Sequence, residues 1–586
     1  MRMNIRLLTT AAFAVILMSL TILVTTTFAQ SSVPIEAYGV WAKSSEFDPS
    51  DPDYDYVLAI TSGSKWKDLQ PDSSDHFDWS ETQSALQLAY DRGQMLYLSI
   101  GVGPEAPEWV YDNGVPKVTT TNGKNKWPYY PYYLDYDYIK FYHNLIQEFG
   151  RFLSTQPQHL IDRIAFVQVK TGCTGDEAPY KGKVIDPNYE ISRAEWLDFR
   201  LKAFEQFRLA FLAGTNPKIP LLFNSIDSSS NPDAWNWVTT HIGSGFGFKG
   251  SAFVRGHHLN GAKTFTENWK PYTINPQGLA LFSRAEMDQS WRKPLYQINE
   301  SLGFYWGAIS GLNSGLTVWD ISTSALKQAA INPSIQQTFR FFNKYAGQIY
   351  PATSTRAFIA LHEGLDVSDT AKFSEDTYGN ANKRNQARYE AICNDPVYAV
   401  RGAQMEDLTA VTKGQVYQRD RQTGYNDAGW EIWPTNYSRF ITQIDPDNES
   451  IGMFRIGGTI DTHSPIYSRF ARAFENSSGK NAMYFKLEDG FFSSPANDVK
   501  VSVIYYDNVN GSTWQLKYDA GTENFKTAYT ITCTGSDTWK TKTVTLTNAV
   551  MLHNGPNGAD FALVNTDELD DIFHMIEIEV PRKSSH

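Results

Sequence analysis

The stretch that decides the fold is residues 164–224, which reads IAFVQVK at 164–170, SRAEWLDFRLKAFEQFRLAF at 192–211 and IPLLFN at 219–224. The two short apolar runs are typical of strands that are buried on both faces of a parallel sheet. Between them, Ser192-x-x-Glu195 matches a capping box, and apolar residues then recur at helical spacing. The stretch therefore predicts a strand, a helix and a second strand in succession.

The same alternation extends over residues 33–350. Eight strand-like runs interleaved with helical patterns predict a (β/α)8 barrel. An open doubly wound sheet is the alternative, but no glycine-rich phosphate loop follows the first strand. The predicted strands are Ile35–Trp41, Tyr56–Ile60, Met95–Ile100, Ile164–Lys170, Ile219–Asn224, Phe246–Lys249, Leu279–Ser283 and Leu316–Trp319.

The C-terminal part of the chain has a different pattern. Residues 351–437 are predicted to form a loop-rich accessory segment, and residues 438–586 an antiparallel β-sandwich with turn signals such as Asn510-Gly511. The predicted sandwich strands are Ser450–Ile456, Ser468–Phe474, Ala482–Leu487, Val499–Tyr506, Thr513–Tyr518, Ala528–Thr534, Lys542–Leu546 and His574–Val580.

The N-terminus has the features of an export signal. Arg2 and Arg6 precede an apolar run, and Thr27-Phe28-Ala29 is similar to a cleavage site, so residues 1–29 are predicted to be a signal peptide. An uncleaved anchor is the alternative. We expect a secreted or periplasmic protein with no membrane partner after cleavage.

The composition excludes several classes of protein. A hydrophobic fraction of 41% excludes intrinsic disorder, and a net charge of -12 argues against a nucleic-acid partner, which requires a basic surface. Three cysteines are too few for a disulfide scaffold, and none lies at metal-ligand spacing with another. Aromatic residues make up 14% of the chain, which favours sugar-stacking surfaces, although core packing accounts for most aromatic residues in any protein.

Two carboxylates follow strands that lie opposite each other in a barrel. Glu177 follows the fourth predicted strand, and Glu286 follows the seventh. In a (β/α)8 barrel the active site forms at the C-terminal ends of the strands. Two carboxyl groups about 5–5.5 Å apart across a glycosidic bond support retaining hydrolysis, with one protonated as acid/base and the other ionised as nucleophile. Arg284 is placed to keep Glu286 ionised.

At this point the chain resembles the retaining glycoside hydrolases of the large barrel clan. The likeness includes Trp66-Lys67-Asp68-Leu69-Gln70-Pro71 with Phe77-Asp78-Trp79, the segment Gly101–Trp109, and Trp319 at the end of strand eight. It implies an acid/base Glu after strand four, which is Glu177, a nucleophile after strand seven, which is Glu286, and no cofactor. Many members of this clan have Asn directly before the acid/base, where it holds the sugar 2-hydroxyl. This chain has Asp176 there, which is therefore a candidate to carry part of that substrate-binding role, and an unusual substrate is the alternative.

Other polar and aromatic residues near the predicted strand ends are candidates for substrate binding. Trp109 and Trp319 are expected to stack on sugar rings. Either His257 or His258 is expected to hydrogen-bond sugar rather than hold a metal, because neighbours in sequence rarely point at one ion. Lys170 and Lys249 are candidates for binding a charged or sulfated sugar, with pairing to Asp or Glu as the alternative. Asn224 completes the predicted binding set.

Glu300 is the rival nucleophile, with Asp288 a weaker one. Glu300 falls on a predicted helix, on the side away from its apolar stripe, so we expect it to face solvent.

The sequence therefore predicts a secreted retaining glycoside hydrolase that acts on a polysaccharide or oligosaccharide, with an algal galactan of the agar or carrageenan type as the leading substrate. A non-catalytic carbohydrate-binding protein and a polysaccharide lyase are the alternatives. No metal or cofactor is expected. The C-terminal sandwich resembles carbohydrate-binding domains, and a purely structural role is the alternative.

Overall fold

The computed structural model describes residues 34–121, 127–173, 178–213, 218–226, 231–243, 245–252, 270, 282–287, 290–292, 299–382, 385–404, 433–458, 463–521 and 525–581. The predicted signal peptide and four of the predicted site residues, Asp176, Glu177, His257 and His258, lie outside the described residues. Within the described ranges, no helix has the length and apolar character needed to span a bilayer.

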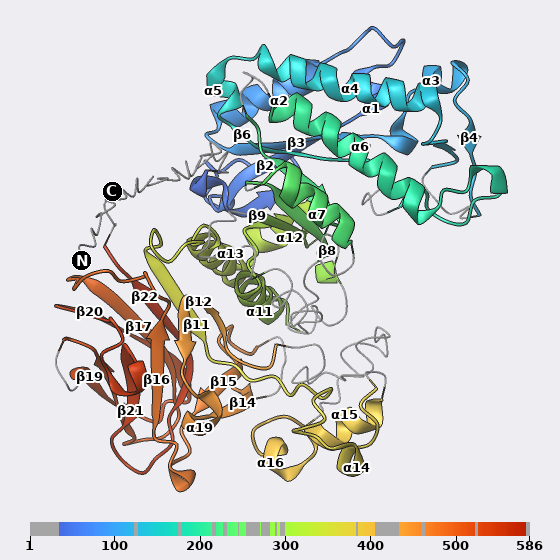
Figure 1. The fold of residues 1–586 in the computed structure, drawn as a ribbon. Coiled ribbons are helices and arrows are strands. Elements are labelled where there is room, and N and C mark those ends of the chain that lie inside the picture. Colours follow the sequence, from blue (N-terminus) through green and yellow to red (C-terminus); the bar gives the residue numbers. More distant parts are fainter. Residues whose placement is uncertain are drawn as a thin grey trace, which may run out of the picture. The chain divides into compact units, whose positions relative to one another are not determined.

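The N-terminal half forms a closed barrel of eight parallel strands (Figure 1), as predicted, in the order β1-β10-β9-β8-β7-β6-β3-β2. Each predicted run supplies one strand, so the open doubly wound sheet is excluded. The strands are β1 Gly39–Ala42, β2 Val57–Lys65, β3 Met95–Gly101, β6 Ile164–Gln168, β7 Leu221–Asn224, β8 Gly247–Ala252, β9 Phe282–Glu286 and β10 Val318–Ile321.

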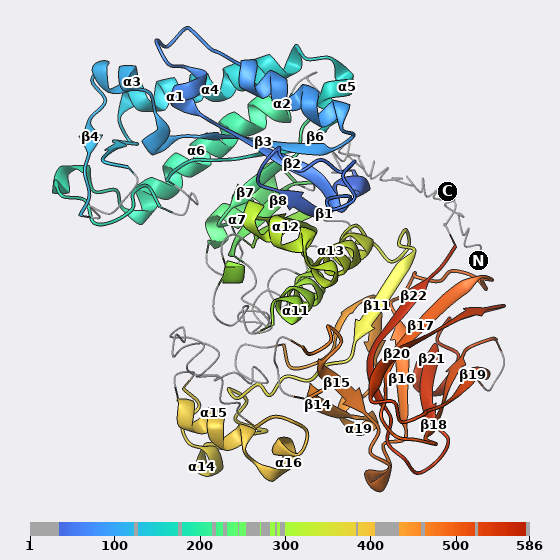
Figure 2. The ribbon, with the colours of Figure 1, turned by 180° about the vertical axis from the view of Figure 1, so that it is seen from behind.

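Helices lie outside the barrel strands (Figure 2). The predicted Ser192 capping box is present and opens α6. The helices of this half are α1 Trp66–Leu69, α2 Ser80–Asp91, α3 Glu108–Asp112, α4 Tyr136–Ser154, α5 Gln158–Ile161, α6 Arg193–Phe211, α7 Pro232–His241, α11 Glu300–Asn313, α12 Thr323–Ala330 and α13 Pro333–Ala346. A small ribbon pairs β4 Lys117–Val118 with β5 Tyr130–Pro131.

Aromatic rings fill the barrel interior. Trp41 from β1 stacks on Tyr97 from β3 and on Phe166 from β6, with ring centroids 5.7 and 5.2 Å apart. Phe166 in turn stacks on Phe282 of β9 at 5.0 Å. This packed layer closes the barrel below its C-terminal end, so chemistry is confined to the mouth.

Two antiparallel sheets form the C-terminal region, which confirms the predicted sandwich. One sheet holds β11 Arg356–Ala360, β12 Tyr437–Arg439, β14 Ile451–Ile456, β15 Arg469–Ala473, β17 Val499–Asp507, β20 Thr538–Leu546 and β22 Ile572–Glu579. The other holds β13 Ile441–Gln443, β16 Ala482–Leu487, β18 Thr513–Tyr518, β19 Lys526–Thr532 and β21 Phe561–Asn565. Short helices α14 Glu375–Tyr378, α15 Gln386–Cys393, α16 Pro396–Ala399 and α19 Pro446–Glu449 accompany them.

The segment assigned to loops contributes a strand to the sandwich. β11 pairs along its whole length with β22, so residues 356–360 belong to the larger sheet. The sequence pattern also missed β21, which pairs with β16 and β18 in the smaller sheet.

Helix α11 is buried on every side, in contrast to the amphipathic helix expected there. Every residue from Leu302 to Asn313 is buried. The Trp306 indole donates a hydrogen bond to the Ser468 carbonyl at 3.1 Å, and the Tyr305 hydroxyl lies 2.7 Å from the His574 imidazole. A helix that is apolar all round signals burial between layers, and here strands of the sandwich supply the second layer.

Candidate active site

Glu286 is the last residue of β9 and lies at the C-terminal end of the barrel, as predicted. Its side chain is 24% exposed. Three cations converge on one carboxylate oxygen, Oε1: Lys249 from β8 at 3.0 Å, Arg284 at 3.3 Å and Lys43, just after β1, at 3.6 Å. No described residue donates a hydrogen bond to the second oxygen, Oε2.

The charges around Glu286 keep it ionised. Burial by itself raises the pKa of the carboxyl group, but Arg284, Lys249 and Lys43 outweigh it and lower the pKa to about 2. The expectation that Arg284 favours the ionised form is confirmed. A carboxylate that is charged at neutral pH, with one oxygen anchored and the other accepting no hydrogen bond from a described residue, has the form of a nucleophile.

Arg284 is held by a buried network below Glu286. Its guanidinium forms an ion pair with Asp320 of β10 and donates hydrogen bonds to the Tyr97 hydroxyl at 2.8 Å and to Gln168 Oε1 at 3.0 Å. It also lies 4.5 Å from the centre of the Tyr97 ring. Asp320 is fully buried, and burial raises its pKa against the opposing effect of Arg284. The network fixes Arg284 as a rigid cation, since the guanidinium fork meets partners from three other strands.

A cavity of about 610 Å³ lies against Glu286 and Arg284, a volume in the range of small-molecule sites. Its lining includes Lys43, Ser62, Tyr97 and Lys170. A second cavity of about 320 Å³ adjoins it. The residues that line both cavities are Gly63, Ser99 and Lys170.

The three other polar candidates within the described residues take different positions. Lys249 forms an ion pair with Glu286, which agrees with the alternative expectation that this lysine pairs with a carboxylate. Lys170 lines the cavities. Asn224 ends β7, is buried, and accepts a hydrogen bond from Gln168 Nε2 at 3.4 Å, which links it to the Arg284 network.

The two tryptophans predicted to stack on sugar are packed inside the protein instead. Trp319 is 1% exposed and faces Phe304, Phe339 and Phe342 of the surrounding helices. The alternation of side chains along β10 explains this, since Trp319 points outward where its neighbour Asp320 points into the barrel.

Trp109 is 8% exposed, packs edge-on against Phe141 at 4.9 Å and donates its indole hydrogen to the Gln70 carbonyl at 2.7 Å. Neither Trp109 nor Trp319 presents a ring face for a sugar to stack on.

The rival nucleophile Glu300 is the first residue of α11. Its carboxylate accepts a hydrogen bond from Gln328 of α12 at 2.7 Å, and it is half-buried rather than facing solvent. It is not among the residues that line the two mouth cavities. Asp288 lies outside the described residues.

Sequence reasoning missed Lys43, Tyr97, Gln168 and Asp320. One signal was available, because a barrel strand that points the Arg284 guanidinium inward needs hydrogen-bond acceptors on the neighbouring strands. Asp320 is the carboxylate in the strand next to β9. In the described part of the chain, no group of three or more metal-ligating side chains comes together.

No protein-family model and no curated protein matches the chain. Among solved structures it is similar to the catalytic domain of a β-amylase from Paenibacillus polymyxa, with 11% identity and a TM-score of 0.34, covering 53% of this chain and 98% of that one. It is also similar to endo-β-1,4-glucanase B from Bacillus halodurans, with 10% identity and a TM-score of 0.36, covering 53% of this chain and 61% of that one.

A third similar structure is xylanase 10B from Thermotoga petrophila in complex with xylobiose, with 12% identity and a TM-score of 0.29, covering 52% of this chain and 95% of that one. At such scores these likenesses carry no weight for function, which has to be argued from the site.

Proposed function

We propose that the protein is a secreted retaining glycoside hydrolase that cleaves polysaccharides by double displacement, with Glu286 as nucleophile and Glu177 as acid/base. One observation carries this proposal. Glu286 lies at the catalytic end of a (β/α)8 barrel, beside a cavity of about 610 Å³, ionised and with no hydrogen bond from a described residue to Oε2.

The mechanism follows from the roles of the two oxygens of Glu286. Oε2 attacks the anomeric carbon while Glu177 protonates the leaving oxygen, which gives a covalent glycosyl-enzyme intermediate. Lys249, Arg284 and Lys43 hold Oε1, so the carboxylate is fixed in orientation as it attacks. Water then attacks the intermediate, Glu177 accepts the proton, and Glu286 is released.

For the finer assignments, we propose an algal galactan of the agar or carrageenan type as substrate and removal of residues 1–29 on export. The first rests on the general organisation of barrel and sandwich, and the second on the N-terminal sequence. Mass spectrometry of the N-terminus of protein from the culture medium tests the second. A mature chain that still begins at Met1 contradicts it.

The test of the activity is a panel of polysaccharides, including agar and carrageenan, treated with wild type, Glu177→Gln and Glu286→Gln. NMR of the first released anomer is expected to show retained configuration. Azide is expected to restore turnover in a Glu177 variant whose glycosyl-enzyme has formed from a substrate with a good leaving group, because the azide anion attacks the intermediate without a general base and releases a glycosyl azide.

Full activity in both variants, or an inverted first product, contradicts the mechanism. A product that absorbs in the ultraviolet through a new C=C bond indicates a lyase instead.

A further inference from the structure

Positive charge gathers at the barrel mouth of a protein whose net charge is -12. Lys43, Lys170 and Arg284 line the larger cavity together with the carboxylates of Glu81 and Glu286, and Lys249 contacts Glu286. The smaller cavity is lined by Lys170 and by Lys65 of β2. Acidic side chains outnumber basic ones in the whole chain, whereas basic side chains outnumber acidic ones among the residues at the barrel mouth.

Several of these cations contact carboxylates of the protein. Arg284 is the ion-pair partner of the buried Asp320, and Lys43 and Lys249 share the single carboxylate of Glu286. The carboxylate of Glu105, at the smaller cavity, is paired with Lys67 at 2.9 Å. Lys65 lies 3.9 Å from Asp68, and both side chains are about half exposed, so that pair is weak.

Lys170 occupies the junction between the two cavities. It lies two residues beyond the end of β6, and its backbone carbonyl accepts a hydrogen bond from the Tyr142 hydroxyl of α4. The backbone is therefore fixed to the helix layer behind it, while the side chain lines both cavities. Ser99, buried and also common to both, adds a neutral hydroxyl beside it.

We propose that the smaller cavity, with Lys170 and Lys65, is a subsite for an anionic substituent, a sulfate ester or a carboxylate, on the saccharide unit next to the one at Glu286. This rests on the proposed function for the class of ligand. An ammonium group binds either anion by charge-assisted hydrogen bonds. Continuity of the two cavities through Gly63, Ser99 and Lys170 lets one chain span both.

The test measures binding separately from catalysis. Glu286→Gln serves as the background, so that polymers are not degraded, and Lys170→Gln and Lys202→Gln are added to it. Lys202 is the matched control, because it is an exposed lysine on α6 that pairs with Asp198 and lies outside both cavity linings. The probes are κ-carrageenan and heparin, each beside its chemically desulfated form, and polygalacturonate beside its methyl ester.

At least one anionic polymer is expected to bind about tenfold more tightly than its neutral partner, as one charge-assisted contact corresponds to about a factor of ten. Lys170→Gln should remove most of that preference, Lys170→Arg should retain it, and Lys202→Gln should leave it unchanged. Preference for the sulfated members identifies a sulfate ester, and preference for polygalacturonate a carboxylate. Thermal melting of each variant checks that it is folded.

The proposal is overturned if no pair is distinguished, if neutral polymers bind as tightly, or if Lys170→Gln and Lys202→Gln change the preference equally. Failure of the proposed function is seen separately, as absence of cleavage by wild type. A charge preference that persists without cleavage supports the subsite and contradicts the hydrolase. Cleavage without a charge preference supports the hydrolase and contradicts the subsite.

Discussion

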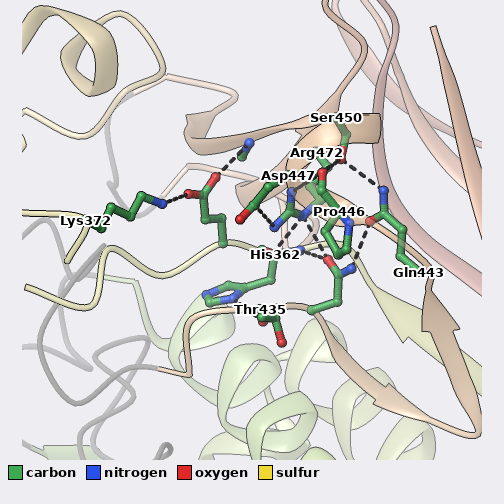
Figure 3. A network of polar contacts seen from close by, with 11 residues as sticks. His362, Lys372, Thr435, Gln443, Pro446, Asp447, Ser450 and Arg472 are labelled. Carbon is green, nitrogen blue, oxygen red and sulfur yellow. Dashed lines mark hydrogen bonds and ion pairs between the residues drawn. The ribbon is translucent and has the colours of Figure 1, made fainter. Parts of the chain in front are cut away.

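Two buried charge clusters, one around Glu286 at the barrel mouth and one around Arg472 in the C-terminal region, show how a functional carboxylate differs from a structural one. Figure 3 shows the second cluster. Arg472 is 1% exposed, and its guanidinium donates hydrogen bonds to the carbonyls of His362 and Pro446 and to the side chains of Asn436 and Ser450.

Glu363 in this cluster is satisfied on both oxygens. Oε1 accepts a hydrogen bond from Lys372 at 3.0 Å, and Oε2 accepts one from the Gly452 amide at 2.9 Å. Burial opposes ionisation, but Arg472 and Lys372 hold the pKa of Glu363 below its usual value. Glu286 has the same sign of pKa shift, yet no described residue donates a hydrogen bond to its Oε2.

The comparison teaches that burial and a lowered pKa do not distinguish the two carboxylates, because both have them. The distinguishing features are the accepting capacity that remains on Oε2 of Glu286 and the cavity beside it. Spare capacity facing a cavity is a means of binding or attacking a ligand, whereas full satisfaction stabilises the fold.

The largest expected effect comes from Glu286→Gln. Hydrolysis should fall by at least about a thousandfold, because the amide does not attack the anomeric carbon. The melting temperature should also fall, because the ionised carboxylate of Glu286 stabilises the fold, so activity is compared at a temperature where each variant is folded. Glu363→Gln is the matched control, and it should lower the melting temperature while kcat for the folded protein is unchanged. If both variants affect activity equally, the distinction between the clusters is wrong.

The next largest effect is expected on stability from Arg472→Met. The change removes a buried cation and leaves its four acceptors without that donor, which should cost about 3 to 5 kcal/mol. Denaturation by urea, followed through tryptophan fluorescence, measures this loss. A variant as stable as wild type would show that this network contributes little to folding.

Arg284→Lys should reduce kcat by about tenfold to a hundredfold. Lysine does not reproduce the guanidinium fork that meets Asp320, Tyr97 and Gln168 together, so Glu286 loses its fixed orientation. The KM should change less than kcat, and the acidic limb of the pH profile should move. Lys202→Gln, which neutralises an exposed lysine of α6, serves as the control. An unchanged kcat in Arg284→Lys contradicts a positioning role.

The smallest effect is expected from Lys249→Gln, and it concerns pH. The pKa of Glu286 is lowered to about 2 in the fold from an ordinary value of 4.5. Its ionised form therefore stabilises the fold above about pH 4.5, and this contribution is lost as the pH falls toward 2. Removing Lys249 should raise that pKa and shift the acidic limb of kcat/KM to higher pH. A limb that does not move indicates that Arg284 and Lys43 suffice.

Much of the barrel was predictable because its strands are short apolar runs separated by helix signals. All eight appear in the predicted order, and Glu286 falls at the end of the seventh. β11 was missed since it is a single strand of five residues within a polar segment, and its partner β22 is more than two hundred residues away. No local pattern contains information about such a pairing.

The orientation of individual side chains was harder to predict than the strands. Trp319 and Asp320 are adjacent in sequence, but the tryptophan packs against helices and the aspartate holds Arg284 inside the barrel. A shift of one residue in strand register exchanges the two faces. The tryptophan was predicted to contact the ligand because aromatic rings stack on sugars. In the structure it is the aspartate whose side chain points into the barrel.

The sequence by itself determined the barrel, the sandwich and the strand-end position of Glu286, because apolar periodicity and strand order are properties of the chain that burial in any compact fold must respect. Only the tertiary structure decided which charges meet. Lys43, Lys249, Asp320 and Tyr97 come from four different strands or strand ends, and closure of the barrel brings them to Arg284 and Glu286. Electrostatic effects act over a few ångströms in space, so the ionised state of Glu286 depends on neighbours that are distant in sequence.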